Sequence, residues 1–219
     1  MFRYVIFDLD GTLLNTIDDL ADAANWVCRV NDWPEHTVDE YKYMVGNGIP
    51  KLCERFSPEA ARTPAQLAST LAQFSARYAA HKEDKTNPYP GVPQLLEKLN
   101  RAGVQVAVFS NKADDLARAI VGHYFGQSVQ AARGYVDGVA PKPAPDGLLP
   151  LMKALGATPE DTLYVGDSNV DVATAHNAKL PCCGVSWGFR GEEELLTAGA
   201  DYIAADANEL CAVVLREDA

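Results

Sequence analysis

The sequence alternates short apolar segments of strand type with longer segments of helical periodicity, and this alternation constrains the fold more than any other feature. Strands are predicted at residues 2–8, 104–109, 162–166, 182–186 and 200–203. Their length and their Val, Ile, Tyr and Phe content are typical of strands covered on both faces. Helical spacing of apolar residues is found between them, at residues 92–103, 113–125 and 145–156. Such alternation predicts a parallel α/β sheet with helices on both sides.

One long region interrupts this alternation after the first predicted strand. It contains no segment of strand character, and residues 17–30 and 64–81 have the periodicity of amphipathic helices. A stiff segment with Pro88, Pro90 and Gly91 follows it. We therefore predict a helical domain inserted into an α/β core. The predicted domains are the core at residues 1–15 and 83–219 and the insertion at residues 16–82.

Composition excludes several classes of partner. The net charge of −11 over 219 residues argues against a nucleic-acid or anionic membrane surface, because phosphate groups require a basic face. No stretch approaches the roughly 20 apolar residues of a membrane span, and no signal peptide is indicated, so a cytoplasmic location is expected. The five cysteines have no CxxC spacing and predict neither a disulfide framework nor a zinc site. A small-molecule substrate is expected, for a monomer or a homodimer.

Polar and ionisable residues follow several of the predicted strands. Because ligands gather beyond the carboxyl ends of parallel strands, these residues are candidates for one site. The candidates are Asp8 and Asp10 after the first strand, Ser110, Asn111 and Lys112 after the second, Asp167 and Asp171 after the third, and Lys142 in the proline-rich segment "APKPAPDG". Each one alone is typical of a turn, a helix cap or a solvated loop. Together, carboxylates without histidine or cysteine predict a Mg²⁺ site.

Four short motifs resemble those of the haloacid dehalogenase (HAD) superfamily. They are "FDLDGT", "SNK", the lysine of "KPAPD" and "GDSNVD", in this order, and "WGFRGEEELLTAGADYI" resembles the C-terminal part of phosphoglycolate phosphatase-type members. The resemblance covers nearly the whole core, and the helical insertion lies where that family has its cap. It implies a Rossmann-like parallel sheet core, the HAD fold, with an inserted helical cap domain of the C1 type.

The resemblance also implies roles for these residues. Asp8 is expected to attack phosphorus and form an aspartyl-phosphate, while Asp10 acts as general acid and then as general base. Mg²⁺ is expected to bind Asp8, the main-chain carbonyl of Asp10 and Asp167. Asp171 would act through metal-bound water or by orienting Lys142.

The remaining implied contacts are with the phosphoryl group. Ser110 and the backbone amide of Asn111 are expected to hold phosphoryl oxygens, and Lys142 to neutralise nucleophile and phosphate. Substrate-binding positions are further expected at Gly11, Thr12 and Lys112. Gly11 also provides the tight turn after Asp10.

The inserted domain contains a second candidate region, "GNGIPK". Gly46, Asn47 and Gly48 resemble the substrate-specificity loop of phosphoglycolate phosphatase-like caps, and Lys51 and Arg55 could bind a substrate carboxylate. A glycine-rich turn with solvated Lys51 and Arg55 is the open alternative. The expected substrate is a small carboxylated phosphate such as 2-phosphoglycolate.

Several other functions are weighed against this one. Dehalogenases and phosphonoacetaldehyde hydrolases lack an acid at the position of Asp10, so that residue argues against both. A sugar phosphomutase of the β-phosphoglucomutase type keeps both aspartates and remains the enzymatic alternative. A non-hydrolytic phosphoacceptor or binding protein is the alternative of a different class. Asp10 and the helical insertion argue against a response-regulator receiver.

Two positions depart from the family pattern. Relatives usually have an aspartate at Asn15, at the hinge into the cap. Lys179 stands where the helix after the fourth motif commonly ends in glycine, and a lysine is expected to resist the left-handed conformation. We therefore expect that helix to end differently.

Overall fold

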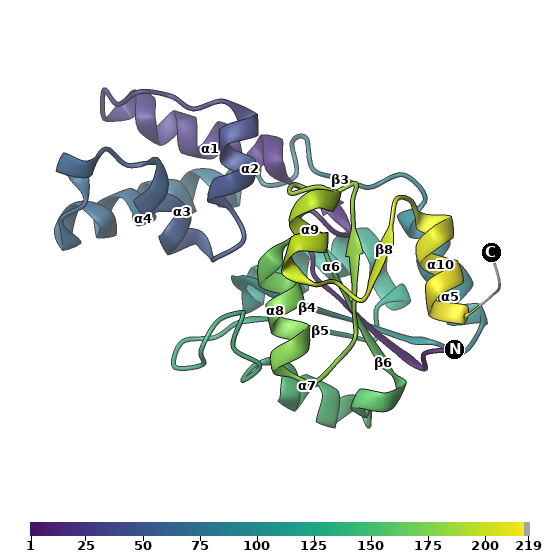
Figure 1. Cartoon of the computed structure of the whole chain (residues 1–219). Helices are drawn as coiled ribbons and strands as arrows, with labels where there is room; N and C mark the ends of the chain where they lie inside the picture. Colours follow the sequence, from purple (N-terminus) through teal and green to yellow (C-terminus); the bar gives the residue numbers. More distant parts are fainter. Residues whose placement is uncertain (217–219) are drawn as a thin grey trace. The chain divides into compact units, whose positions relative to one another are not determined.

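The computed structural model describes residues 1–216 and divides into two compact units (Figure 1). The first unit contains residues 1–14 and the chain from Pro88 onward, and the second contains Asn15–Asn87. Within residues 1–216, no helix is both long enough and apolar enough to cross a lipid bilayer.

The first unit is built on a six-stranded parallel sheet in the order β5-β4-β1-β6-β7-β8 (Figure 1). Its strands are β1 (Tyr4–Phe7), β4 (Gln105–Ala113), β5 (Ala131–Tyr135), β6 (Thr162–Gly166), β7 (Cys182–Val185) and β8 (Tyr202–Ala204). When the strands of this sheet are renumbered by their order along the chain, their order across the sheet is 3-2-1-4-5-6. This is the strand order of a doubly wound fold. Such folds bind ligands at the carboxyl ends of the strands next to the first one, which here are β1, β4 and β6.

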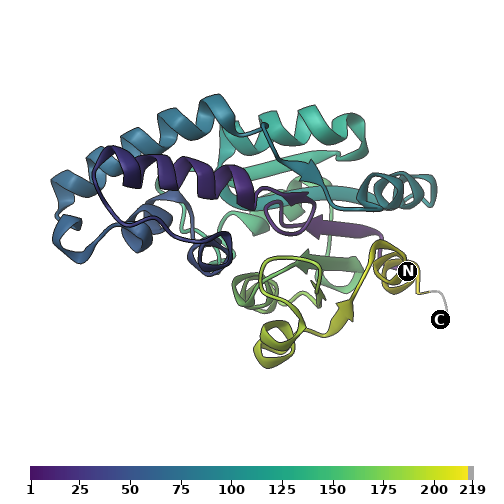
Figure 2. The same ribbon diagram turned by 90° about the horizontal axis from the view of Figure 1, so that it is seen from above.

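Helices cover both faces of the sheet (Figure 2). They are α5 (Val92–Arg101), α6 (Asp114–Phe125), α7 (Leu148–Leu155), α8 (Asn169–Asn177), α9 (Glu192–Ala198) and α10 (Ala207–Leu215), with short 3₁₀ turns η2 (Gly126–Ser128) and η3 (Pro159–Asp161). Successive strand residues point to opposite faces, so Val5 and Phe7 join a core with α5, α6 and α10. Ile6 joins the other core, with α7, α8 and α9. The parallel α/β sheet with helices on both sides is therefore confirmed.

All five predicted strands are present, but the second is longer than predicted: β4 continues four residues past 109 to Ala113, so Ser110, Asn111 and Lys112 lie within the strand and not after it. The strand β5 was not predicted. Its sequence, Ala-Ala-Arg-Gly-Tyr, has no apolar run, and it forms an edge of the sheet with mostly half-buried residues. Gly134 is required there, because a side chain would overlap the main-chain oxygen of Lys112. The pairing of β5 with β4 therefore depends on a close backbone approach rather than on strand propensity.

The second unit is helical, as predicted for the insertion. It contains α1 (Ile17–Val30), α2 (Val38–Met44), α3 (Ile49–Phe56), α4 (Pro64–His81) and the 3₁₀ turn η1 (Glu59–Ala61). Its core is largely aromatic: Phe56 contacts Tyr41 and Phe74, and Phe74 stacks on Tyr78 at 5.6 Å between ring centroids. The short strands β2 (Leu14–Asn15) and β3 (Asn87–Pro88) lie where the chain passes between the units.

The buried carboxylate of Asp19 joins the two ends of the helical unit. It accepts hydrogen bonds from the backbone N–H of Thr86 at 2.8 Å and from its hydroxyl at 2.7 Å. The backbone N–H of Lys85 also donates to it, at 3.0 Å. A buried carboxylate is stable only with such donors, so this aspartate fixes the start of α1 against the segment that leaves the unit.

The expectation that Lys179 would avoid the left-handed conformation is wrong. Lys179 has a φ of 63°, and its N–H donates to the carbonyl of His176. The N–H of Leu180 donates to the carbonyl of Ala175 at 2.9 Å. These two bonds form a Schellman motif, which satisfies the last carbonyls of α8 and holds the lysine in a conformation that usually requires glycine.

We predict that Lys179→Gly stabilises the protein. Glycine adopts a positive φ without steric cost, so the free energy of unfolding should rise by about 0.5–1 kcal/mol. Chemical denaturation measures this change. Lys179→Ala is the matched control, because it removes the charge but keeps Cβ and should not stabilise; equal effects of the two variants would contradict the explanation.

Candidate active site

The loop after β1 forms the centre of the candidate site. Asp8 follows the strand directly, and its N–H donates to the carbonyl of Val165 in β6 at 2.8 Å. The chain then turns tightly, with the N–H groups of Leu13 and Leu14 both donating to the carbonyl of Leu9 at 3.0 Å. Gly11 has a φ of 89°, and a Cβ at this position would overlap the Asp167 carboxylate. This turn therefore requires glycine.

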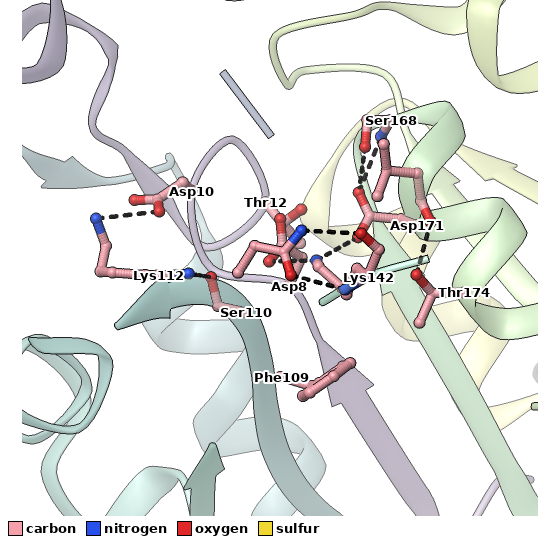
Figure 3. Close-up of polar contacts among 12 residues, drawn as sticks. Asp8, Asp10, Thr12, Phe109, Ser110, Lys112, Lys142, Ser168, Asp171 and Thr174 are labelled. Carbon is pink, nitrogen blue, oxygen red and sulfur yellow. Dashed lines mark hydrogen bonds and ion pairs between the residues drawn. The ribbon is translucent and has the colours of Figure 1, made fainter. Parts of the chain in front are cut away.

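The ammonium group of Lys142 lies between two buried carboxylates (Figure 3). Its Nζ forms an ion pair with Asp8 Oδ1 at 2.8 Å. It donates to Asp171 Oδ1 at 2.7 Å. The Lys142 side chain is only 2% exposed, so its charge acts on both carboxylates with little screening by water.

Asp171 is held by several protein donors besides Lys142. Its Oδ2 accepts a hydrogen bond from the Ser168 hydroxyl at 2.6 Å, and Ser168 is the N-cap of α8 (Figure 3). The Tyr164 hydroxyl lies 3.3 Å from both Asp171 Oδ1 and Lys142 Nζ. Both oxygens of Asp171 therefore have donors within the protein.

Asp167, at the end of β6, is held by the segment after β7. Its Oδ2 accepts a hydrogen bond from the N–H of Phe189 at 2.7 Å, and the Thr12 hydroxyl lies 3.5 Å from Oδ1. The Trp187 indole N–H donates to the carbonyl of Thr12 at 3.0 Å. Residues 187–189 thus hold both the Asp167 carboxylate and the loop that follows Asp8.

Asp10 and the end of β4 form the other side of the site (Figure 3). Asp10 Oδ2 is 3.1 Å from Lys112 Nζ, and the Lys112 side chain is 1% exposed. The N–H of Lys112 donates to the Ser110 hydroxyl at 3.2 Å. Asp10 Oδ1 is buried without a hydrogen-bond partner among residues 1–216. That oxygen is therefore available to a ligand.

Burial dominates the protonation equilibria of these groups. Desolvation, opposed by Lys142 and assisted by Asp171, raises the pKa of Asp8 to about 7. Desolvation and the charges of Asp171 and Asp8 raise the pKa of Asp167 well above its usual range. Burial alone would lower the pKa of Lys142, but the attraction of Asp171 and Asp8 exceeds this effect and raises it well above its usual value. Lys142 is therefore charged at neutral pH.

The carboxylates fit a divalent metal ion. Asp8, Asp167 and Asp171 each offer one oxygen, and these oxygens lie within 4.8 Å of one another. When all three carboxyl groups are ionised, one lysine does not balance their charge, and a bound cation would compensate the remainder. Hard oxygen donors are the ligands that Mg²⁺ and similar ions prefer.

The candidate residues of the helical unit form a braced loop. Arg55 donates to the main-chain oxygen of Met44 at 2.6 Å and to Asn47 Oδ1 at 2.8 Å. Gly46 and Gly48, which flank Asn47, both have positive φ. Lys51 forms an exposed ion pair with Glu54 at 2.7 Å. Arg55 is thus integrated into the loop, whereas Lys51 is at the surface of the unit.

Comparisons with known proteins identify the family. Residues 5–185 match the model of the haloacid dehalogenase-like hydrolases. The chain belongs to the haloacid dehalogenase-like hydrolases. Phosphoglycolate phosphatase of Caulobacter vibrioides is 34% identical over 91% of this chain and 85% of its own length. Phosphoglycolate phosphatase of Vibrio parahaemolyticus is 29% identical over 97% of this chain and 96% of its own.

A solved structure agrees with this assignment. A protein from Lactobacillus delbrueckii subsp. bulgaricus, provisionally described as a phosphoglycolate phosphatase, superposes with a TM-score of 0.92. It is 31% identical, over 97% of this chain and 98% of its own. The expected HAD fold with a C1 cap is confirmed, and the chain is a phosphatase of phosphoglycolate phosphatase-like character.

Sequence reasoning missed two contacts at this site. Tyr164 was treated only as a strand residue, although a tyrosine buried in a central strand needs a hydrogen-bond partner, and this requirement was the available signal. The side chain of Asn111, expected to matter only for its backbone amide, bonds to the main chain of Lys142. No local pattern connects residues 31 positions apart.

We predict that Gly11→Ala weakens divalent-cation binding. The new methyl group would displace the Asp167 carboxylate, and the positive φ would cost about 1–2 kcal/mol of unfolding free energy. Calorimetric titration with Mg²⁺ and chemical denaturation measure the two effects. Gly103→Ala is the matched control, because Gly103 has a φ of 80° and open space around it. Both variants should lose stability, and only Gly11→Ala should lose cation binding; normal binding by Gly11→Ala would contradict the packing argument.

Proposed function

We propose that this protein is a Mg²⁺-dependent phosphomonoesterase that works through an aspartyl-phosphate on Asp8. The observation that carries the proposal is the buried Asp8 carboxylate with the ammonium of Lys142 at 2.8 Å and two further carboxylates beside it. Positive charge next to the nucleophile lets an anionic phosphate approach an anionic carboxylate. Membership in the HAD hydrolases supports the same chemistry.

In this proposal the two aspartates after β1 divide the chemistry. An Asp8 oxygen attacks phosphorus, the bond to the alcohol oxygen breaks, and Asp10 protonates the leaving alkoxide. Asp10 then takes a proton from water, which attacks the phosphorus of the aspartyl-phosphate and releases inorganic phosphate. The buried Asp10 Oδ1, without a hydrogen-bond partner in the described residues, supports this role as a proton carrier.

The neighbouring residues are assigned to binding and charge. Ser110, the N–H of Asn111 and Lys142 hold phosphoryl oxygens, with Gly11, Thr12 and Lys112 beside them. Asp8, the carbonyl of Asp10 and Asp167 hold Mg²⁺, which when bound neutralises phosphoryl charge. We assign Asp171 to orienting Lys142 rather than to binding the metal directly, because both of its oxygens accept short hydrogen bonds, at 2.7 and 2.6 Å, whereas Asp167 Oδ1 has only the Thr12 hydroxyl at 3.5 Å among residues 1–216.

The proposed substrate is a small carboxylated phosphate such as 2-phosphoglycolate. The names of the two relatives and the presence of Lys51 in the helical unit support this choice. Gly46 and Asn47 would belong to the loop that selects the substrate.

We predict that Mg²⁺ stabilises the protein more at pH 8 than at pH 6. Because the pKa of Asp8 is about 7 without a cation, only about a tenth of this carboxyl is ionised at pH 6, so apparent affinity should be roughly tenfold weaker there. The raised pKa also implies that, in EDTA, the contribution of Asp8 to the free energy of unfolding falls as pH rises from about 4 to about 7. Thermal unfolding with and without Mg²⁺ measures both effects.

Two variants serve as controls for this cation effect. Asp167→Asn should abolish the stabilisation by Mg²⁺, while Asp115→Asn, at an exposed position in α6, should retain it. A shift in Tm that is independent of pH and survives in Asp167→Asn would contradict the proposed site.

We predict that Asp8→Asn abolishes phosphate release and that Asp10→Asn reduces it about 10²- to 10⁴-fold, the usual contribution of a general acid–base. The assay measures phosphate released with and without Mg²⁺ from 2-phosphoglycolate, p-nitrophenyl phosphate and β-glucose 1-phosphate. Asp115→Asn should remain fully active.

Each outcome discriminates between mechanisms. Turnover that survives in Asp8→Asn would remove the nucleophile assignment, and unchanged turnover in Asp10→Asn would remove the acid–base assignment. Formation of glucose 6-phosphate in place of free phosphate would favour the phosphomutase alternative. A phosphorylated wild-type protein that persists for hours would favour a phosphoacceptor function.

A further inference from the structure

The side chain of Asn111 makes two hydrogen bonds to the main chain of Lys142. The N–H of Lys142 donates to Asn111 Oδ1 at 2.8 Å, and Asn111 Nδ2 donates to the carbonyl of Lys142 at 3.2 Å. An amide side chain can satisfy both the N–H and the C=O of one residue, as a neighbouring strand does by hydrogen bonding in a sheet. Both residues are buried, so water does not replace these bonds easily.

This contact lies where the backbone has few other means of attachment. Lys142 belongs to residues 136–147, which form neither helix nor strand in the structure. Its neighbours Pro141 and Pro143 have no backbone N–H, so Lys142 supplies the only backbone N–H donor of these three residues. Asn111 accepts that donor, and Asn177 binds the carbonyl of Pro143 at 2.9 Å.

We infer that the Asn111 side chain is a positioning residue that fixes the backbone of Lys142, so that the ammonium group lies between Asp8 and Asp171. The ammonium lies at the end of a flexible four-carbon chain, and its two carboxylate contacts define only the far end of that chain. Asn111 defines the near end of that chain, from the carboxyl-terminal part of β4. The expected effect of Asn111 on the catalytic rate rests on the proposed function. Its expected effect on the backbone of Lys142 does not.

The helical unit provides a matched control for this contact. Asn25 makes the same pair of bonds to the main chain of His36, with the His36 N–H donating at 3.0 Å and Asn25 Nδ2 donating at 2.9 Å. Asn111→Ala and Asn25→Ala therefore both remove a pair of bonds to the main chain, and Asn25→Ala also removes the hydrogen bond that the Tyr41 hydroxyl donates to Asn25 Oδ1 at 2.8 Å. Only the first of these contacts involves Lys142.

The first experiment follows amide hydrogen exchange of the full-length protein without substrate. Asn111→Ala should speed exchange of the Lys142 amide at least tenfold, whereas Asn25→Ala should speed exchange of the His36 amide and leave Lys142 unchanged. Unchanged exchange at Lys142 in Asn111→Ala would overturn the inference. This result does not depend on any catalytic activity.

The second experiment is a double-mutant cycle on kcat with p-nitrophenyl phosphate and Mg²⁺. Asn111→Ala should lower kcat roughly 10- to 100-fold, the usual effect of a misplaced group, and Asn25→Ala should leave it unchanged. In the Lys142→Ala background, Asn111→Ala should cost no more than about twofold, because the group that it positions is absent.

The outcomes separate this inference from the proposed function. An active wild type whose Asn111→Ala variant keeps its full kcat, or loses the same factor with and without Lys142, overturns the inference and leaves the function intact. A wild type that releases no phosphate from any ester overturns the proposed function, and hydrogen exchange then decides the structural inference alone. Hydrogen exchange also decides it if Lys142→Ala does not fold.

Discussion

The structure depends on the charge of one buried lysine. Asp8 and Asp171 are buried carboxylates that would repel each other, and Lys142 lies within 2.8 Å of both. Leaving one partner of a buried ion pair uncompensated typically costs about 3–5 kcal/mol, so the segment that carries Lys142 must reach the ends of β1 and β6. That requirement explains why a segment without helix or strand is buried at Lys142 and attached there by Asn111.

Three glycines allow the chain segments around this charge cluster to approach one another. A Cβ on Gly11 or on Gly188 would overlap Asp167, and a Cβ on Gly166 would overlap Asp171. Each glycine lies in a motif that also carries or contacts an acidic residue, as in Asp10-Gly11 and Gly166-Asp167. The glycines are therefore part of the site's chemistry, because they set how closely the carboxylates pack.

The sequence predicted those features that follow from local patterns. The strand ends at Asp8 and Asp167 could be found because apolar runs stop where polar residues begin. The same rule placed the end of β4 too early, because that strand continues through Ser110, Asn111 and Lys112 to Ala113. The edge strand β5 was missed because its stability comes from pairing with β4, which no property of Ala-Ala-Arg-Gly-Tyr indicates. Lys179 was misjudged because two backbone hydrogen bonds outweigh the steric preference of a single residue. The Asn111–Lys142 contact could not be foreseen from the sequence, because it joins residues far apart in the chain and no periodic pattern indicates it.

Under the proposed function, the choice of substrate would depend on which basic residue of the helical unit can accept a carboxylate. Arg55 holds the loop through Met44 and Asn47, so a substrate that recruits it would have to break two short hydrogen bonds. Within residues 1–216, Lys51 forms an ion pair with the exposed Glu54, and water screens such surface pairs strongly. Exchanging Glu54 for a substrate carboxylate would therefore cost little. If the proposed function holds, Lys51 is the better suited of these two residues to contact the substrate, and Arg55 is better suited to shape the loop beside it.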